Sequence, residues 1–147
     1  MVVRPHRPSD LNTLYKIDQE CFPPEIAYTR GDLERFVRHR NSKTWVAEEN
    51  GQVAGFLVAG REPPKVAHLI TIDVLHKWRR RGIGSALLKV AEAWARSVGI
   101  EVIYLETAVN NQAAQRLYEA REYRRVECLD DYYGRGAPAW VMMKRLA

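Results

Sequence analysis

The segment DVLHKWRRRGIGSA, from Asp73 to Ala86, joins the end of an apolar, β-branched run to the start of an amphipathic helix. Three consecutive arginines in it are followed by two glycines, Gly82 and Gly84. The first N–H groups of a helix have no partner inside the helix, and the helix dipole places partial positive charge there. The segment therefore predicts an anion cradle of backbone N–H groups with arginines beside it.

The residues on both sides of this segment predict a strand before it and a helix after it. Residues 66–74 follow a hairpin over residues 44–59, in which Asn50-Gly51 suits the positive φ angles of a type I′ turn. Apolar residues then recur at three- and four-residue steps from Ile83 to Val98, and Gly99 predicts the helix end. Lys89, Glu92 and Arg96 fall outside this apolar stripe.

The remaining residues predict further elements on both sides of this centre. A short strand over residues 2–4 precedes a helix that Ser9 or Asp10 caps and a second helix capped by Thr29. A strand over 102–107, a helix capped by Asn110 or Asn111 and strands over 123–129 and 139–143 complete the chain. This order predicts a single α/β domain over residues 1–147, built on one mixed sheet. The cradle lies after a strand, where open α/β sheets bind ligands.

Composition limits the classes of function. Hydrophobic residues make up 46% of the 147 and charged residues 28%, which is typical of a soluble globular protein. The formal net charge of +5 admits a nucleic-acid partner, but the aromatic residues are not interleaved with basic ones as stacking platforms would be. No apolar run suits a membrane span. Cys21 and Cys128 are expected to be buried thiols in a reducing cytoplasm.

Two common phosphate-binding patterns do not fit the cradle. The P-loop sequence is absent, and Leu87 stands where the third glycine of a dinucleotide-binding fingerprint belongs. Residues 76–81 also separate the strand from the first glycine, where that fold makes a tight turn. A simpler alternative is that the glycines only allow close helix packing and the arginines form a solvated surface.

The spacing Arg79-x-x-Gly82-x-Gly84 resembles the acetyl-coenzyme A signature of the GNAT acetyltransferase superfamily. The run LETAVNNQAAQRLY over residues 105–118 is similar to the protein N-terminal acetyltransferases, above all the ribosomal-protein-alanine acetyltransferases and their archaeal relatives. The sequences CFPP over 21–24 and DYY over 131–133 strengthen the likeness. It implies a single GNAT-like domain with a central mixed, mostly antiparallel sheet flanked by about four helices.

The resemblance also implies a co-substrate, acetyl-CoA, and no metal. In that family the N–H groups of the glycine turn hold the coenzyme's pyrophosphate, and the preceding strand offers backbone partners to its pantetheine arm. Asn111 resembles a side chain that contacts this arm. The residues assigned to the coenzyme are Ile72, Asp73, Val74, Arg79, Arg80, Arg81, Gly82, Ile83, Gly84, Ser85 and Asn111.

Two residues are implied to do the chemistry. Glu106 matches the subfamily's proposed general base, and Tyr118 matches its proposed general acid toward the leaving sulfur. An α-amine has a pKa of about 7.7–8.0, against about 10.4 for lysine, so an α-amine substrate needs only a modest base. The local sequence alone also allows an edge-strand glutamate facing solvent and a half-buried core tyrosine.

Tyr28, Asp131 and Tyr133, with Tyr132 and Glu25 nearby, are implied to flank the acceptor entrance. The expected function is acetyl transfer to a protein N-terminal α-amine, for example of a ribosomal protein, by a cytoplasmic monomer or homodimer. Two alternatives remain open at this stage: a small-amine or lysine acetyltransferase, and a non-catalytic module that binds acetyl-CoA or nucleic acid. No membrane partner is expected.

Two positions depart from the family pattern. Glu122 replaces the glycine that ends the helix in relatives, and a non-glycine residue is strained at positive φ. We therefore predict a different helix ending that displaces Tyr118. Pro138 enters the last hairpin, where it is expected at an edge or at a strand start.

Overall fold

A computed structural model describes residues 1–146 of the chain, so residue 147 of the expected domain lies outside it. The strands are β1 (Val2–Pro5), β2 (Ser42–Glu49), β3 (Gln52–Glu62), β4 (Val66–Val74), β5 (Val102–Ala108), β6 (Arg124–Leu129) and β7 (Ala139–Arg145). The α-helices are α1 (Leu11–Cys21), α2 (Arg30–Arg38), α3 (Ile83–Ser97) and α4 (Gln112–Ala120). The element order predicted from the sequence is confirmed.

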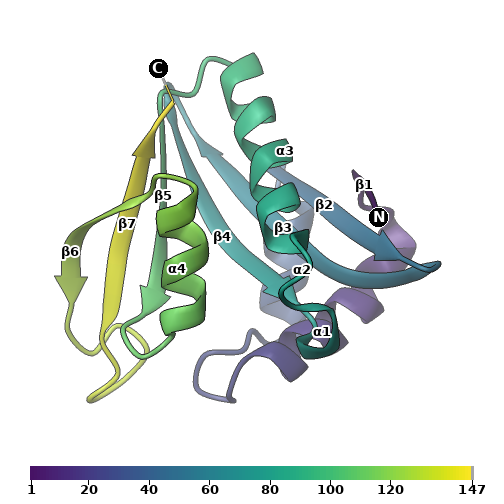
Figure 1. Cartoon of the computed structure of the whole chain (residues 1–147), viewed down its shortest axis with the longest axis horizontal. Helices are drawn as coiled ribbons and strands as arrows, with labels where there is room; N and C mark the ends of the chain where they lie inside the picture. Colours follow the sequence, from purple (N-terminus) through teal and green to yellow (C-terminus); the bar gives the residue numbers. More distant parts are fainter. Residues whose placement is uncertain (147) are drawn as a thin grey trace.

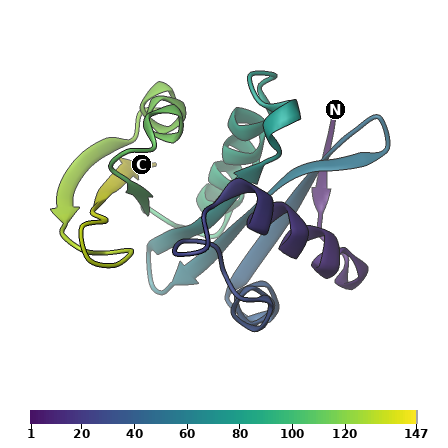
Figure 2. The same ribbon diagram turned by 90° about the horizontal axis from the view of Figure 1, so that it is seen from below.

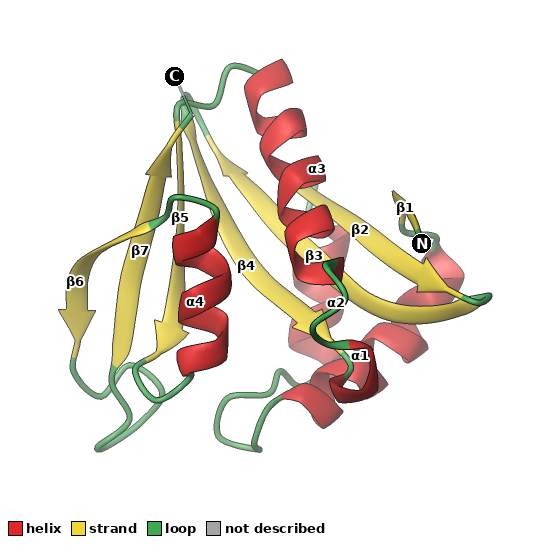
Figure 3. Cartoon of the chain, viewed as in Figure 1, coloured by secondary structure: helices red, strands yellow, loops and turns green. Residues whose placement is uncertain are grey.

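The strands form one 7-stranded sheet in the order β1-β2-β3-β4-β5-β7-β6. Helices α3 and α4 cover one face, and α1 and α2 lie behind the other (Figures 1 and 3). Seen from below, α1 and the loop after it cross the sheet close to the end of β4 (Figure 2). The hairpin between β2 and β3 has positive φ at both Asn50 (51°) and Gly51 (75°), as the type I′ prediction requires.

The centre of the sheet opens where β4 and β5 meet. These strands are parallel, and their pairing runs only from Val66 with Val102 to His68 with Tyr104. Beyond His68 they diverge, so that a gap separates their C-terminal halves (Figure 1). The second half of β4 pairs with β3 on one side and has no strand partner on the other within residues 1–146. The divergence therefore leaves strand edge available in the middle of the sheet.

The two glycines of the cradle serve different purposes. Gly82 has φ of 79°, a left-handed conformation that glycine adopts without a Cβ clash. Gly84 lies against α4, because a Cβ on it would come within 2.8 Å of Leu117 Cδ2. Close helix packing thus explains the second glycine but not the first.

The ending of α4 contradicts the sequence-based prediction. Glu122 has φ of 72° and occupies the left-handed position after α4 that favours glycine. The Tyr123 N–H donates to the Tyr118 carbonyl at 3.0 Å and the Glu122 N–H to the Glu119 carbonyl at 2.9 Å, a Schellman ending. The prediction of a different helix ending was wrong, because this bonding tolerates a strained residue at one position. Pro138 directly precedes β7, as expected.

Glu92, outside the apolar stripe of α3, is nevertheless fully buried. Its Oε1 accepts hydrogen bonds from Arg121 Nη2 at 2.7 Å and Lys144 Nζ at 2.8 Å. Its Oε2 accepts one from the Tyr123 hydroxyl at 3.1 Å. Buried charges occur where they are paired and hydrogen-bonded, and periodicity alone does not show such a partner. Arg121, directly before Glu122, belongs to this network.

The expectation that both cysteines are buried thiols was wrong for one of them. Cys21 is partly buried, whereas Cys128 is exposed on β6, whose side chains are mostly exposed. No helix within residues 1–146 is both long enough and apolar enough to cross a bilayer.

Candidate active site

The predicted anion cradle is present as a run of free backbone donors. Within the described chain, the N–H groups from Arg80 to Ser85 have no backbone or side-chain acceptor, and the first helical bond joins Ala86 N–H to the Gly82 carbonyl. Positive φ at Arg80 (63°) and Gly82 (79°) shapes the turn. These donors at the start of α3 suit a pyrophosphate.

The three arginines beside the cradle differ from one another. Arg79 Nε donates to the Val74 carbonyl at 2.9 Å and so ties the turn to the end of β4. The Arg81 guanidinium lies 4.9 Å from the centre of the Trp78 ring. Arg80 makes no side-chain hydrogen bond or ion pair in the described residues, which leaves its guanidinium available to an anionic ligand.

The strand expected to meet the pantetheine arm is partly occupied by side chains. The Val74 carbonyl accepts from Arg79 and also from Cys21 Sγ at 3.4 Å. The Ile70 carbonyl accepts from the Tyr28 hydroxyl at 3.3 Å. The predicted contact at Val74 would therefore have to use its N–H group. Ile72 and Asp73 lie on the same stretch, where β4 has separated from β5.

Glu106 is paired with a histidine that the sequence analysis did not identify. It lies on β5, just beyond the last residue that pairs with β4, and β5 has neighbours on both sides. His68 Nε2, from β4, lies 2.6 Å from Glu106 Oε1. The Glu106 side chain is 13% exposed, so the edge-strand alternative is wrong. The spacing of residues 68 and 106 gave no signal, because only strand register brings them together.

The His68 ring is held by aromatic packing. It stacks on Tyr104 with ring centres 4.5 Å apart and planes 6° from parallel. The Tyr104 hydroxyl donates to Glu62 Oε2 at 2.6 Å. These contacts fix the imidazole that faces Glu106.

Tyr118 lies on α4 in the main core and is 5% exposed. Burial, aided by the nearby Asp73 and Tyr133, raises the pKa of its phenol above the ordinary value. The phenol is therefore protonated at neutral pH and can act as a donor. Its ring packs edge-on against Tyr123, 6.0 Å between centres.

Two of the predicted acceptor tyrosines, Tyr132 and Tyr133, lie within reach of the charge of Glu106. Burial and then the charge of Glu106 raise the pKa of Tyr132. Burial first, and then Tyr132 and Glu106, raise the pKa of Tyr133. Burial, with Tyr132 nearby, raises the pKa of Tyr28. The rings of Tyr132 and Tyr133 pack edge-on, 4.8 Å apart. The Tyr28 ring, on the loop after α1, packs edge-on against Phe36 with 5.1 Å between ring centres.

Two other predicted residues have structural contacts of their own. Asp131 Oδ1 accepts from the Gly136 N–H at 2.6 Å, which stabilises its loop. Asn111 Oδ1 accepts from the Ala114 N–H at 3.2 Å, so Asn111, and not Asn110, caps α4. The Asn111 amide nitrogen makes no hydrogen bond in the described residues, so it stays available as a donor.

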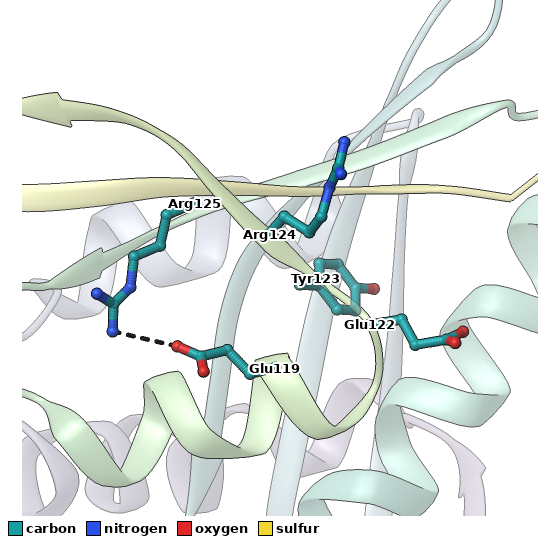
Figure 4. A pocket seen from close by; sticks show the side chains of 5 residues that line it. All are labelled: Glu119, Glu122, Tyr123, Arg124 and Arg125. Carbon is teal, nitrogen blue, oxygen red and sulfur yellow. Dashed lines mark hydrogen bonds and ion pairs between the residues drawn. The ribbon is translucent and has the colours of Figure 1, made fainter.

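A hollow of about 520 Å³ lies elsewhere, between the end of α4 and the start of β6 (Figure 4). Arg125 and Glu119 form an ion pair across it at 3.1 Å. None of its lining residues belongs to the predicted site; they are Glu119, Glu122, Tyr123, Arg124 and Arg125.

Known proteins resemble this chain in sequence and in fold. The sequence profile of the Acetyltransferase (GNAT) family matches residues 11–123. An N-alpha-acetyltransferase of Sulfurisphaera tokodaii is 31% identical in an alignment that covers 95% of this chain and 90% of the relative. The chain therefore belongs to the GNAT acetyltransferase family, and it is an N-acetyltransferase.

Solved structures share the fold. The ribosomal-protein-S18-alanine N-acetyltransferase of Escherichia coli matches with a TM-score of 0.89 at 22% identity, covering 99% of this chain and 94% of that one. The NAA60 protein of Arabidopsis thaliana, in complex with acetyl-CoA, matches with a TM-score of 0.85 at 22% identity over 98% and 97% of the two chains.

Proposed function

We propose that the protein transfers the acetyl group of acetyl-CoA directly to the α-amine of a protein N-terminus. The observation that carries the proposal is the Glu106–His68 pair, 2.6 Å apart, at the point where β4 and β5 separate. The cradle of free N–H groups follows β4 along the chain. Acetyl-CoA supplies the activated thioester. The similarity to N-alpha-acetyltransferases supports the acceptor class.

The cradle and the unpaired half of β4 carry backbone groups that suit the coenzyme. The N–H groups from Arg80 to Ser85 provide several donors for a pyrophosphate, and Arg80 adds a free cation. The unpaired half of β4 offers backbone groups to an amide-containing arm, and the Asn111 amide offers one more donor. The metal-free site expected from the sequence stays a prediction.

The proposed roles divide between a base and an acid. Glu106 accepts the proton of the acceptor ammonium, directly or through water, while the His68 N–H holds the carboxylate in place. The neutral amine attacks the thioester carbonyl, and Tyr118, kept protonated by burial, gives its proton to the sulfur as the C–S bond breaks. The second proton that the nitrogen loses on forming the amide restores the phenol. The rings of Tyr132 and Tyr133, and of Tyr28 on the other loop, are proposed to provide faces on which an α-ammonium binds.

The α-amine is favoured over lysine by its own acidity. The difference in pKa, about 2.5 units, corresponds to about 3.5 kcal/mol of deprotonation that an α-amine avoids. A modest carboxylate base is therefore sufficient for an α-amine, whereas a lysine acceptor would carry this additional cost. A ribosomal protein is the proposed acceptor, and the proposed setting is the cytoplasm, with the enzyme acting as a monomer or homodimer.

A panel of amines tests the acceptor class. Steady-state rates with peptide α-amines, spermidine and an aminoglycoside should show kcat/KM highest for the peptides. Measurable turnover of the polyamine or aminoglycoside without turnover of any peptide would contradict the proposal.

Three matched variants test the assigned roles. Glu106→Gln should lower kcat by about 10²–10⁴-fold, the usual contribution of a general base. His68→Phe retains a ring that can stack on Tyr104 but lacks the N–H bond to Glu106, so it should lower kcat less than Glu106→Gln. Tyr118→Phe should lower kcat while KM for the peptide stays close to wild type. Full kcat in both Glu106→Gln and Tyr118→Phe would refute the roles.

A further inference from the structure

Two carboxyl groups that the proposed chemistry does not use are buried together between α1 and β4. Asp18, on α1, is 0% exposed, and Asp73, on β4, is 1% exposed. Asp18 Oδ2 accepts from the Tyr28 N–H at 2.8 Å. Asp73 Oδ1 accepts from the Thr71 hydroxyl at 2.5 Å. The other two oxygens, Asp18 Oδ1 and Asp73 Oδ2, are buried and have no further partner within residues 1–146.

Ionising both of these carboxyl groups at neutral pH would be costly in such a place. Like charges held together in a buried site push one proton onto the pair, and a buried oxygen without a donor is costly. Burial first, and then hydrogen bonding and charge from Asp18, raise the pKa of Asp73 well above its ordinary value. A single proton on Asp73 Oδ2, donated to Asp18 Oδ1, satisfies both remaining oxygens.

The groups packed around the pair leave this proton in place. Arg79 is the cation whose charge reaches Asp73. From α1, burial raises the pKa of the Cys21 thiol to about 12, and burial also raises the phenol pKa of Tyr28 in the loop and of Tyr118 on α4. These three groups are neutral at pH 7. The pair therefore carries one negative charge, opposed by one guanidinium.

The pair connects the two sides of the proposed site. Asp18 holds the backbone of Tyr28, the residue before the N-cap of α2, and Gln19 Nε2 donates to the Tyr28 carbonyl at 2.7 Å. The Tyr28 hydroxyl returns to the Ile70 carbonyl of β4 at 3.3 Å. Asp73 belongs to the half of β4 that faces the gap beside β5.

We propose that Asp18 and Asp73 are positioning residues that share one proton, and that this proton holds the Tyr28 loop against the strand lining the coenzyme site. The proposal rests on the proposed function for its kinetic readout. When the proton leaves at alkaline pH, the two carboxylates repel and the loop loosens. The acceptor KM then rises while the base and acid stay in place, so kcat changes less.

Infrared spectroscopy tests the shared proton without any activity measurement. At pH 7 the wild type should show the carbonyl stretch of a protonated carboxylic acid, since exposed carboxyl groups are ionised at that pH. Asp73→Asn should abolish the band. No such band in the wild type, or a band that survives in Asp73→Asn, would overturn the proposal even if every peptide is a substrate.

Kinetics and hydrogen exchange test the positioning. Asp73→Asn keeps a donor toward Asp18 at every pH, whereas Asp73→Leu removes it. Asp73→Leu should raise the peptide KM at least tenfold more than Asp73→Asn and should speed exchange of the Tyr28 N–H. The alkaline rise in KM should be missing in Asp73→Asn. Thr44→Val, a control at another buried side chain with an unpartnered oxygen, should leave KM unchanged.

The outcomes separate the two proposals. Equal KM effects of Asp73→Asn and Asp73→Leu, or an alkaline rise retained in Asp73→Asn, would refute the positioning role while peptide turnover upholds the function. Absence of turnover on all peptides with the infrared band present would refute the function and leave the shared proton standing.

Discussion

Replacing Glu92 by Met tests the buried charge network that joins α3, α4 and β7. Glu92 is fully buried, and its removal leaves Lys144, which is 9% exposed, without its carboxylate. Arg121 is 25% exposed and can turn its guanidinium toward water. Breaking a buried ion pair from one side costs about 3–5 kcal/mol. Because one of the two cations is partly solvated, we expect Glu92→Met to lower the free energy of unfolding by about 3 kcal/mol.

Urea unfolding followed by circular dichroism measures this loss. The double variant Glu92→Met/Lys144→Met removes both buried charges, so it should be more stable than Glu92→Met alone. The denaturant slope should stay unchanged, since the surface exposed on unfolding is similar. A loss below about 1 kcal/mol for Glu92→Met, or additive losses in the double variant, would refute the assigned role of the network.

The same network predicts a dependence on pH. Burial by itself would raise the pKa of Glu92, but hydrogen bonds from Arg121 and Lys144 outweigh it and hold the pKa below its usual value. A carboxyl with a lowered folded-state pKa stabilises the fold above its unfolded pKa of about 4.3. That stability is lost as the pH falls through the folded-state pKa. Unfolding curves of Glu92→Met should therefore lack this part of the acid destabilisation seen in the wild type.

Three further predictions concern the backbone and the thiols. Glu122→Gly should raise the unfolding free energy by about 1 kcal/mol, because the residue has φ of 72°. Glu119→Gly, inside α4, should lower the unfolding free energy by about the same amount, and thermal melts compare the two variants. Asn111→Ala should cost about 1 kcal/mol through loss of the α4 cap, and a smaller loss in urea unfolding would argue against that cap. A thiol reagent at pH 8 should label the exposed Cys128 well before Cys21, because burial raises the pKa of the Cys21 thiol to about 12. Equal labelling rates would contradict this difference between the two thiols.

Most of the fold could be predicted because the sequence pattern is local and regular. The helix over α3, the Asn50-Gly51 turn and the meander of β2 to β4 follow from periodicity and turn chemistry. The cradle could also be located, since a glycine pair after basic residues marks a helix start. In contrast, the left-handed Glu122 was missed, because the hydrogen bonds that hold it depend on packing around α4.

The least predictable features depend on pairing between distant residues. His68 meets Glu106 only because β4 and β5 are parallel neighbours with a particular register. Glu92 is buried because Arg121 and Lys144 reach it from other elements. A single sequence shows each of these residues as an ordinary polar position. The partners of buried polar side chains therefore could not be predicted from the sequence alone.

The central claim is that Glu106 and His68 serve a reaction at an α-amine. One peptide that carries both a free N-terminal α-amine and an internal lysine places the two acceptors in direct competition. After incubation with acetyl-CoA, tandem mass spectrometry locates the added acetyl group. We expect acetylation at the N-terminal α-amine, with Glu106→Gln suppressing it. Acetylation mainly on the lysine side chain would contradict the account.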